Sequence, residues 1–241
     1  FGHDKDINAI IVTPSKSLKS LSINKNTINA ESGVMLGRLV KEAIKRNLTG
    51  LESLVGVPGT LGGALMMNAG AWGSEISNYL VSVDVINTDG KMKTLNPQDI
   101  EFKYRYSSFK SSDFILSAKF RLKKASKVEI EKKKLIASKG RINSQPLKFR
   151  SAGSVFKNPH NKLAAGLLID MAGLKGARHG GAEISTHHAN FFINHGDAKA
   201  NDIANLIRLS RKTVYEKFGI MLELEIKTIG FKGSDLLPYA I

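Results

Sequence analysis

The sequence has no cysteine, a single tryptophan, far fewer acidic than basic residues, and no long apolar segment. Without cysteine the chain cannot form a disulfide, a thiolate nucleophile, a thiolate zinc site or an iron–sulfur cluster. Its longest apolar candidate, residues 61–67, falls far short of the roughly 20 residues that span a bilayer. These absences predict a soluble protein of a reducing compartment, the cytoplasm, with no membrane partner.

The shortage of acidic residues leaves 36 Lys+Arg against 21 Asp+Glu, a formal net charge of +15. Such an excess attracts polyanions, so nucleic-acid binding is one possible interpretation. However, 27 of the basic residues are lysines, scattered along the chain and rarely beside aromatics. The densest run, Lys132–Lys134, follows Glu129 and Glu131 and is typical of a solvated helix face. We expect a lysine-rich surface or a site for small anions, and no nucleic acid.

The 241 residues suffice for one large domain or two ordinary ones. Strands and helices are mixed without strict βαβ alternation, which predicts an α+β fold. The charged composition of residues 123–139 predicts a helical connector between two parts. Predicted strands lie at residues 18–23, 27–30, 81–87, 91–95, 114–122, 191–193 and 222–229, with a short β-branched run at 9–12; predicted helices lie at 34–47, 164–172 and around 203–218.

Glycine is concentrated in residues 50–73, which hold seven glycines in 24 positions. Such density leaves backbone N–H groups unshielded, so the main chain can approach a phosphate or a flat ring. The segment is neither a Walker A loop nor a dinucleotide-binding GxGxxG. The alternative is a set of tight turns between buried elements.

Three further segments carry candidate chemistry. Arg105, between Tyr104 and Tyr106, offers a planar fork for a carboxylate or phosphate, or is a surface residue. Ser154 is expected on a Gly/Ser loop at 151–154, before Lys157 and Asn158, but with no GxSxG elbow and no nearby base such a serine is more often a turn residue. Residues 178–190 hold three histidines without an HExxH pattern, so no metal site is expected.

These segments, in this order and with FGIMLELEIKTIG at 218–230, resemble the UDP-N-acetylenolpyruvoylglucosamine reductase family over residues 7–230. The resemblance implies an FAD-binding domain of the vanillyl-alcohol-oxidase type at 1–125 and a C-terminal α+β substrate-binding domain at 126–241. It also implies FAD as cofactor, NADPH as hydride donor, a nucleotide-sugar substrate of peptidoglycan synthesis, and a monomer. Two alternatives stay open: another flavoprotein of the same superfamily, and a non-catalytic basic binding module.

The resemblance also assigns residues. The catalytic group would comprise Arg105 at the substrate carboxylate, Ser154 as proton donor, and Glu225, which alternation places on the same face as Glu223. The implied FAD contacts are Gly33, Val34, Gly59, Thr60, Leu61, Gly62, Gly63, Asn68, Ala69 and Gly70. The implied substrate contacts are Tyr104, Arg141, Gln145, Lys157 and Asn158, with Gly180, Gly181 and Glu183 at the boundary between flavin and substrate.

Two departures from the family pattern matter. The family's N-terminal Gly-Ser-Asn pyrophosphate loop has no counterpart before Ile7, so the chain as given is expected to be a fragment that binds FAD poorly. Leu167 stands where many relatives have lysine. The short spacing between Arg105 and Ser154 leaves no room for an inserted tyrosine-bearing loop, which resembles the shorter subclass.

Overall fold

The computed structural model describes residues 2–5, 7–159 and 163–238. It divides into two compact units, which we call the N-terminal unit (Ile11–Arg141) and the C-terminal unit (Ile142–Ile241 with Phe1–Ile10). Both units mix helices with antiparallel sheets, as expected for the predicted α+β class. The expected domain boundary between residues 125 and 126 stays a prediction. No helix in the described ranges is long and apolar enough to cross a membrane.

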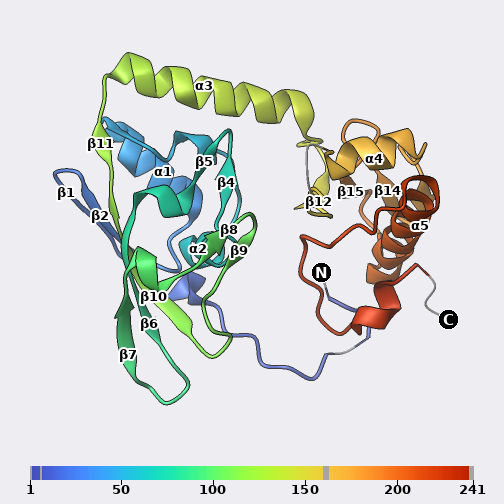
Figure 1. Cartoon of the computed structure of the whole chain (residues 1–241), viewed down its shortest axis with the longest axis horizontal. Coiled ribbons are helices and arrows are strands. Elements are labelled where there is room, and N and C mark those ends of the chain that lie inside the picture. The colour runs from blue at the N-terminus through green and yellow to red at the C-terminus, as the bar shows by residue number, and fades with distance from the viewer. Residues whose placement is uncertain (1, 6, 160–162, 239–241) are drawn as a thin grey trace. The chain divides into compact units, whose positions relative to one another are not determined.

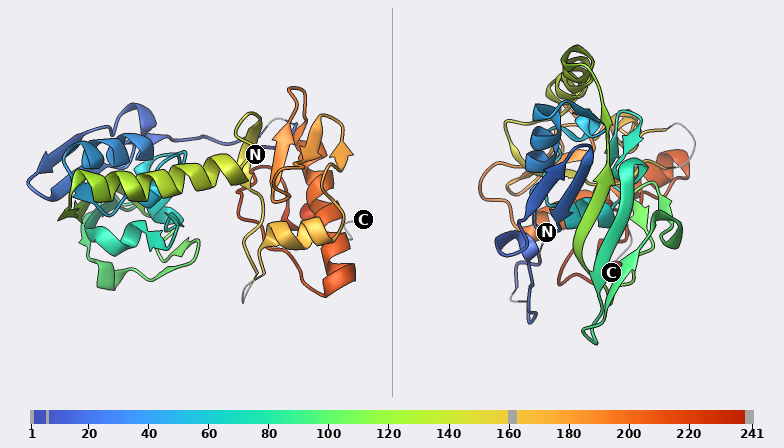
Figure 2. Two further views of the ribbon diagram at one scale, coloured as in Figure 1. Left: turned by 90° about the horizontal axis from the view of Figure 1, so that it is seen from above. Right: turned by 90° about the vertical axis from the view of Figure 1, so that its left-hand side faces the viewer.

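A five-stranded antiparallel sheet, in the order β1-β2-β10-β6-β7, forms the body of the N-terminal unit (Figure 1; Figure 2, right). The predicted hairpin is confirmed, because Val83 pairs with Leu95 and Ile86 with Met92. The strands are β1 (Leu21–Asn24), β2 (Thr27–Glu31), β6 (Leu80–Ile86), β7 (Met92–Leu95) and β10 (Phe114–Arg121).

Two helices pack on the core of this sheet. Helix α1 (Leu36–Lys45) confirms the helical spacing of 34–47, and its buried Leu36, Leu39 and Val40 join a cluster that includes Phe120 of β10. Helix α2 (Leu61–Met66) was not predicted, because its two glycines obscure a helical pattern. It forms because Thr60 caps its first turn by accepting a hydrogen bond from Gly63 N, at 3.4 Å.

Three short two-stranded sheets complete the N-terminal unit, together with α3 (Lys127–Ser144), the predicted charged helix, which extends just past this unit. Ile130 and Ala137 are the buried residues of α3, one heptad apart on the face turned to the unit. The short strands are β3 (Leu48–Thr49) with β11 (Lys123–Lys124), β4 (Gly70–Ala71) with β5 (Ser74–Glu75), and β8 (Phe102–Lys103) with β9 (Tyr106–Ser107).

The C-terminal unit has a four-stranded antiparallel sheet in the order β12-β15-β14-β13. Two helices share its core, and α5 lies against β13 and β14 (Figure 1; Figure 2, left). The elements are β12 (Arg150–Ser154), β13 (Arg178–His179), β14 (Ala182–Ile184), β15 (Phe191–Asn194), α4 (Ala165–Met171) and α5 (Ala200–Phe218). They confirm the predicted helices at 164–172 and 203–218 and the strand at 191–193.

Three predictions of local structure are wrong. Residues 222–229 form no continuous strand, because they pair through two isolated bridges, Leu224 with Phe156 and Ile229 with Gly2, and neither partner segment continues into a ladder among the described residues. Residues 151–154 form part of strand β12 rather than a loop, because a bulge with Gly153 at φ +83° absorbs the irregularity. The run at 9–12 pairs with no described strand.

Candidate active site

The glycine-rich segment predicted to contact FAD is joined by main-chain hydrogen bonds to the loop after β2. Leu61 N donates to Val34 O and Gly62 N to Ser32 O, both at 2.8 Å, and Leu36 N donates to Gly59 O at 3.0 Å. The two stretches implied by the resemblance, 33–34 and 59–62, therefore lie side by side.

Four of the glycines that the resemblance assigns to FAD differ in their surroundings. A Cβ added at Gly59, whose φ is +110°, would meet nothing within 4 Å, and one at Gly63 would meet only Thr60 Oγ1 at 3.8 Å. By contrast, a Cβ at Gly33 would lie 2.2 Å from Pro14 O, and one at Gly70 would lie 2.8 Å from Glu75 Cγ. Gly59 and Gly63 thus present backbone to open space, whereas Gly33 and Gly70 are required by protein packing.

Asn68 connects this segment to the arginine loop. Its side chain is fully buried at a φ of +41°, and Nδ2 donates to Glu75 Oε2 at 2.6 Å and to Lys103 O at 3.2 Å. Among the described residues its Oδ1 has no hydrogen-bond partner, and neither has the buried Oγ of Ser32. Buried oxygens without partners are uncommon and call for an explanation.

Arg105 occupies the turn between β8 and β9. Its φ of +54° is unusual for a residue with a Cβ and marks local backbone strain. Its Nη1 donates to Gly70 O at 3.2 Å, and the guanidinium lies 5.0 Å from the centre of the Tyr104 ring. The strained turn directs the arginine toward the glycine-rich segment.

Arg141, near the end of α3, is a second cation in the same unit. Burial lowers the pKa of Arg141, and the positive charge of Arg105 lowers it further. Its Nε is buried and has no hydrogen-bond partner within residues 2–5, 7–159 and 163–238. A guanidinium stays protonated in proteins, so two neighbouring cations favour an anion beside them.

In the C-terminal unit, Ser154 ends β12, half-buried, and the chain continues beside residues 223–225. Glu225 N donates to Val155 O, and Lys157 N donates to Glu223 O, both at 2.8 Å. The predicted catalytic residues Ser154 and Glu225 therefore lie on neighbouring segments. The Nζ of Lys157 forms an ion pair with Glu223, a partner that the sequence did not predict for it.

The other predicted substrate residues are more dispersed. Asn158 Oδ1 accepts a hydrogen bond from Ala165 N at 3.1 Å and thereby caps the start of α4. Gln145 follows α3 in the C-terminal unit, and its carbonyl accepts from Leu147 N at 2.9 Å. Tyr104 and Arg141 belong to the N-terminal unit.

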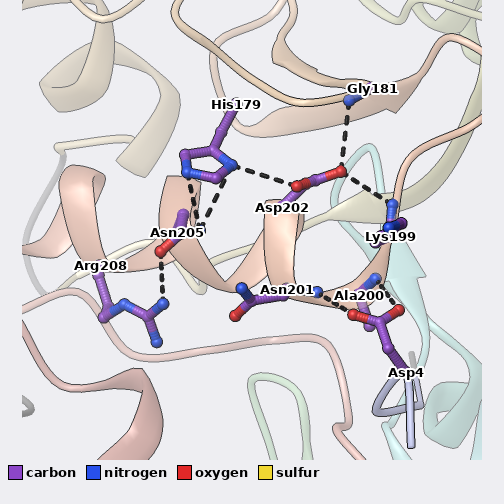
Figure 3. A network of polar contacts seen from close by, with 9 residues as sticks. All are labelled: Asp4, His179, Gly181, Lys199, Ala200, Asn201, Asp202, Asn205 and Arg208. Atoms are coloured by element: carbon purple, nitrogen blue, oxygen red, sulfur yellow. Dashed lines mark hydrogen bonds and ion pairs between the residues drawn. The ribbon is translucent and has the colours of Figure 1, made fainter.

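The histidine-rich segment forms a polar network around Asp202 of α5 (Figure 3). Asp202 accepts from Lys199 N at 2.9 Å and from Gly181 N at 3.3 Å, and it contacts His179 Nδ1 at 3.2 Å. The hydrogen bond from Lys199 N is the main cause of the lowered pKa of Asp202. A Cβ at Gly180 would lie 2.4 Å from Asp202 Oδ2, and its φ is +49°, so packing and backbone conformation both favour this glycine.

Glu183 lies buried on β14, between Arg178 and His195. Arg178 Nε and His195 Nε2 contact its Oε2 at 2.6 and 2.9 Å. Burial raises the pKa of Glu183, but these two hydrogen bonds outweigh that effect and the net shift is downward. The carboxylate is therefore held ionised. Its expected position at the boundary between flavin and substrate stays a prediction. No group of three potential metal ligands occurs within the described ranges.

Comparison with known proteins agrees with this geometry. Residues 2–96 match an FAD binding domain, and residues 145–229 match the C-terminal domain of UDP-N-acetylenolpyruvoylglucosamine reductase. The chain is 47% identical over 230 residues to the UDP-N-acetylenolpyruvoylglucosamine reductase of Caldicellulosiruptor bescii, covering 94% of this chain and 73% of that protein. It is 42% identical to that of Chloroherpeton thalassium, covering 95% and 75%.

A solved structure supports the same relationship. The crystal structure of the reductase from Thermus caldophilus superposes with a TM-score of 0.77 at 37% identity, covering 86% of this chain and 74% of that one. The predicted pairing of an FAD-binding domain of the vanillyl-alcohol-oxidase type with a C-terminal α+β domain is confirmed. The chain belongs to the UDP-N-acetylenolpyruvoylglucosamine reductase family.

Proposed function

We propose that this chain catalyses the FAD-dependent, NADPH-driven reduction of UDP-N-acetylglucosamine enolpyruvate to UDP-N-acetylmuramate, a step in peptidoglycan precursor synthesis. The single observation that carries the proposal is the 47% identity to a reductase of that name over 94% of the chain. The cytoplasmic location and the monomeric state expected from the sequence remain predictions.

The N-terminal unit has features that fit FAD. Gly59 and Gly63 present backbone to open space, and Ser32 and Asn68 hold buried oxygens with no hydrogen-bond partner in the described part of the chain. These residues, with Thr60 and the neighbouring main chain, would hold the cofactor through backbone groups and short side chains. Bound FAD supplies the capacity to accept and donate a hydride.

Arg105 would bind the enolpyruvyl carboxylate. Hydride addition at C3 leaves negative charge at C2, which spreads into that carboxylate as an enolate. A fixed guanidinium stabilises the charge as it develops, and its planar fork matches both carboxylate oxygens. Arg141 reinforces the positive potential felt at Arg105, consistent with the effect of Arg105 on its pKa.

Ser154 would donate the proton that C2 requires. A hydroxyl is a weak acid, but an enolate carbon is strongly basic, so no activating histidine is needed. Glu225, whose backbone joins it to Val155 beside Ser154, would contribute a second polar group at the reacting carbons. Lys157 and Asn158, with Tyr104 and Gln145, would bind the uridine diphosphate and sugar.

The proposal is tested by the visible spectrum of purified full-length protein. We expect a flavin band that NADPH bleaches and that UDP-N-acetylglucosamine enolpyruvate restores under anaerobic conditions, with UDP-N-acetylmuramate identified by mass spectrometry. Restoration by another substrate, and not by UDP-N-acetylglucosamine enolpyruvate, would indicate another flavoprotein of the superfamily. A colourless protein with salt-sensitive oligonucleotide binding would indicate a basic binding module.

A further inference from the structure

Residues 155–157 connect the proposed proton donor Ser154 to the proposed substrate ligands Lys157 and Asn158. One edge of this stretch is held by the main chain of residues 223–225, through Glu225 N to Val155 O and Lys157 N to Glu223 O. The regular pairing of β12 with β15 ends at Ser154, opposite Phe191. The backbone N–H and C=O groups of Phe156, on the other edge, therefore need hydrogen-bond partners that the regular sheet no longer supplies.

That partner is one side chain, Asn190. Its Oδ1 accepts a hydrogen bond from Phe156 N at 2.9 Å, and its Nδ2 donates to Phe156 O at 2.8 Å. The main-chain carbonyl of Asn190 also accepts a hydrogen bond from Val155 N at 2.8 Å. Asn190 is 3% exposed and the Phe156 side chain is fully buried, so this amide pair is shielded from water.

The turn that carries Asn190 is itself fixed in place. Asn190 N donates to His188 Nδ1 at 3.2 Å, and Ser185 Oγ accepts from His188 N at 3.3 Å. The His188 ring packs edge-on against Phe191 with centroids 4.8 Å apart. A Cβ at Gly166 of α4 would lie 3.0 Å from His188 Cε1, so the helix also packs closely on this turn.

We propose that Asn190 is a positioning residue for the reduction: its amide fixes the backbone of Phe156 and thereby places Ser154 and Lys157. The inference rests on the proposed function, which assigns the roles of those two residues. Catalytic groups must be held to within a fraction of an ångström, and misplacement by about 1 Å can cost about 10²-fold in rate. Without the Asn190 amide the backbone of Phe156 would be free to move, and Ser154 and Lys157 would move with it.

A buried asparagine could also serve stability alone, so the test needs a control matched for stability. We choose Asn190→Asp, which keeps an acceptor for Phe156 N but turns a carboxylate oxygen toward Phe156 O, and Asn190→Ser, which shortens the side chain without adding charge. The control is Val214→Ala on α5, a fully buried residue of the same core that contacts none of these groups by hydrogen bonds.

Three measurements on the full-length holoenzyme decide the question: both half-reactions by stopped flow, melting temperature, and amide hydrogen exchange. For both Asn190 variants we expect flavin reduction by NADPH within about twofold of wild type. We expect reoxidation by the enolpyruvyl substrate to slow about tenfold or more, with faster exchange at Phe156 and Lys157. Val214→Ala is measured as far below its own melting temperature as the Asn190 variants are below theirs. We expect its reoxidation rate, and the exchange rates of the Phe156 and Lys157 amides, to stay within about twofold of wild type.

Asn190 variants that reoxidise like Val214→Ala would overturn the positioning role while leaving the proposed function intact, because wild-type turnover tests that function separately. If neither variant folds, the wild-type protein still decides. Rapid exchange of the Phe156 amide in wild type, at the rate of an exposed loop amide, would show that Asn190 does not fix this segment.

Discussion

The two units hold their candidate site residues by different means. In the N-terminal unit, main-chain bonds between the loop at 32–36 and the segment at 59–62 carry the arrangement, and glycine is required where chain meets chain. In the C-terminal unit, polar side chains act in addition to the main-chain bonds between 155–157 and 223–225: Asn190 holds Phe156, Asn158 caps α4, and Glu223 pairs with Lys157. The first arrangement should be sensitive to added bulk, and the second to the loss of particular hydrogen-bonding groups.

The largest effect is expected from Ser154→Ala, which removes the proposed proton donor from the C-terminal unit. Without protonation at C2 the enolate returns the hydride, so reoxidation of the flavin by substrate should slow at least about 10²-fold, within or above the usual range for general acids. Flavin reduction by NADPH should stay close to wild type. Ser154→Cys, which keeps a transferable proton, should recover part of the loss. Stopped-flow reoxidation as fast as wild type would make Ser154 a turn residue.

Arg105→Lys probes the N-terminal unit at its one proposed catalytic side chain. Lysine keeps the charge but cannot form a bidentate fork on a carboxylate, so kcat/KM for the enolpyruvyl substrate should fall at least about tenfold. Arginine and lysine both carry a Cβ, so the φ of +54° at position 105 strains them alike and we expect folding to be unchanged. Steady-state kinetics with an intact melting temperature would check this, and near-native turnover would remove Arg105 from the site.

A pair of glycine substitutions tests whether close approach shapes the N-terminal unit. Alanine usually stabilises a helix relative to glycine by about 1 kcal/mol. Gly37→Ala in α1 meets nothing within 4 Å and should follow that rule. Gly140→Ala in α3 would place Cβ 2.1 Å from the Trp72 ring and should destabilise by about 1–3 kcal/mol. Urea unfolding compares the two, and stabilisation by both would contradict the packing of Trp72 on α3.

The sequence predicted the elements with strong local patterns and missed the long-range polar contacts. The hairpin at 80–95 and helix α5 follow from alternation, an Asp-Gly turn and helical spacing. Residues 222–229 alternate as a strand would, but alternation says nothing about the length of the partner. Asn190 acts on Phe156, 34 positions away, and a single asparagine gives no local signal for such a contact. The site residues came from resemblance rather than from pattern.

The smallest expected effect is a pH dependence of stability in the C-terminal unit. Burial lowers the pKa of His188 below the ordinary value of 6.5. As the pH falls through about 6.5, His188 takes up a proton in the unfolded chain but stays neutral in the folded one. The contribution of His188 to stability is therefore complete above pH 6.5 and declines below it. His188→Gln should remove that decline, whereas His187→Gln, at an exposed neighbour, should retain it. Melting temperatures between pH 5 and pH 8 distinguish them, and identical profiles would contradict a half-buried, neutral His188.

The central claim is that the C-terminal unit serves the substrate step and not the reduction of the flavin. Glu225→Gln tests it most directly. Glu225 is half-buried, its main chain is hydrogen-bonded to Val155 next to Ser154, and glutamine preserves the size of the side chain. With both half-reactions followed at the flavin band in one preparation, the account predicts that reduction by NADPH survives within about twofold while reoxidation by the enolpyruvyl substrate slows about 10-fold or more. Equal slowing of the two half-reactions would contradict the claim and would place Glu225 in the scaffold or in cofactor binding.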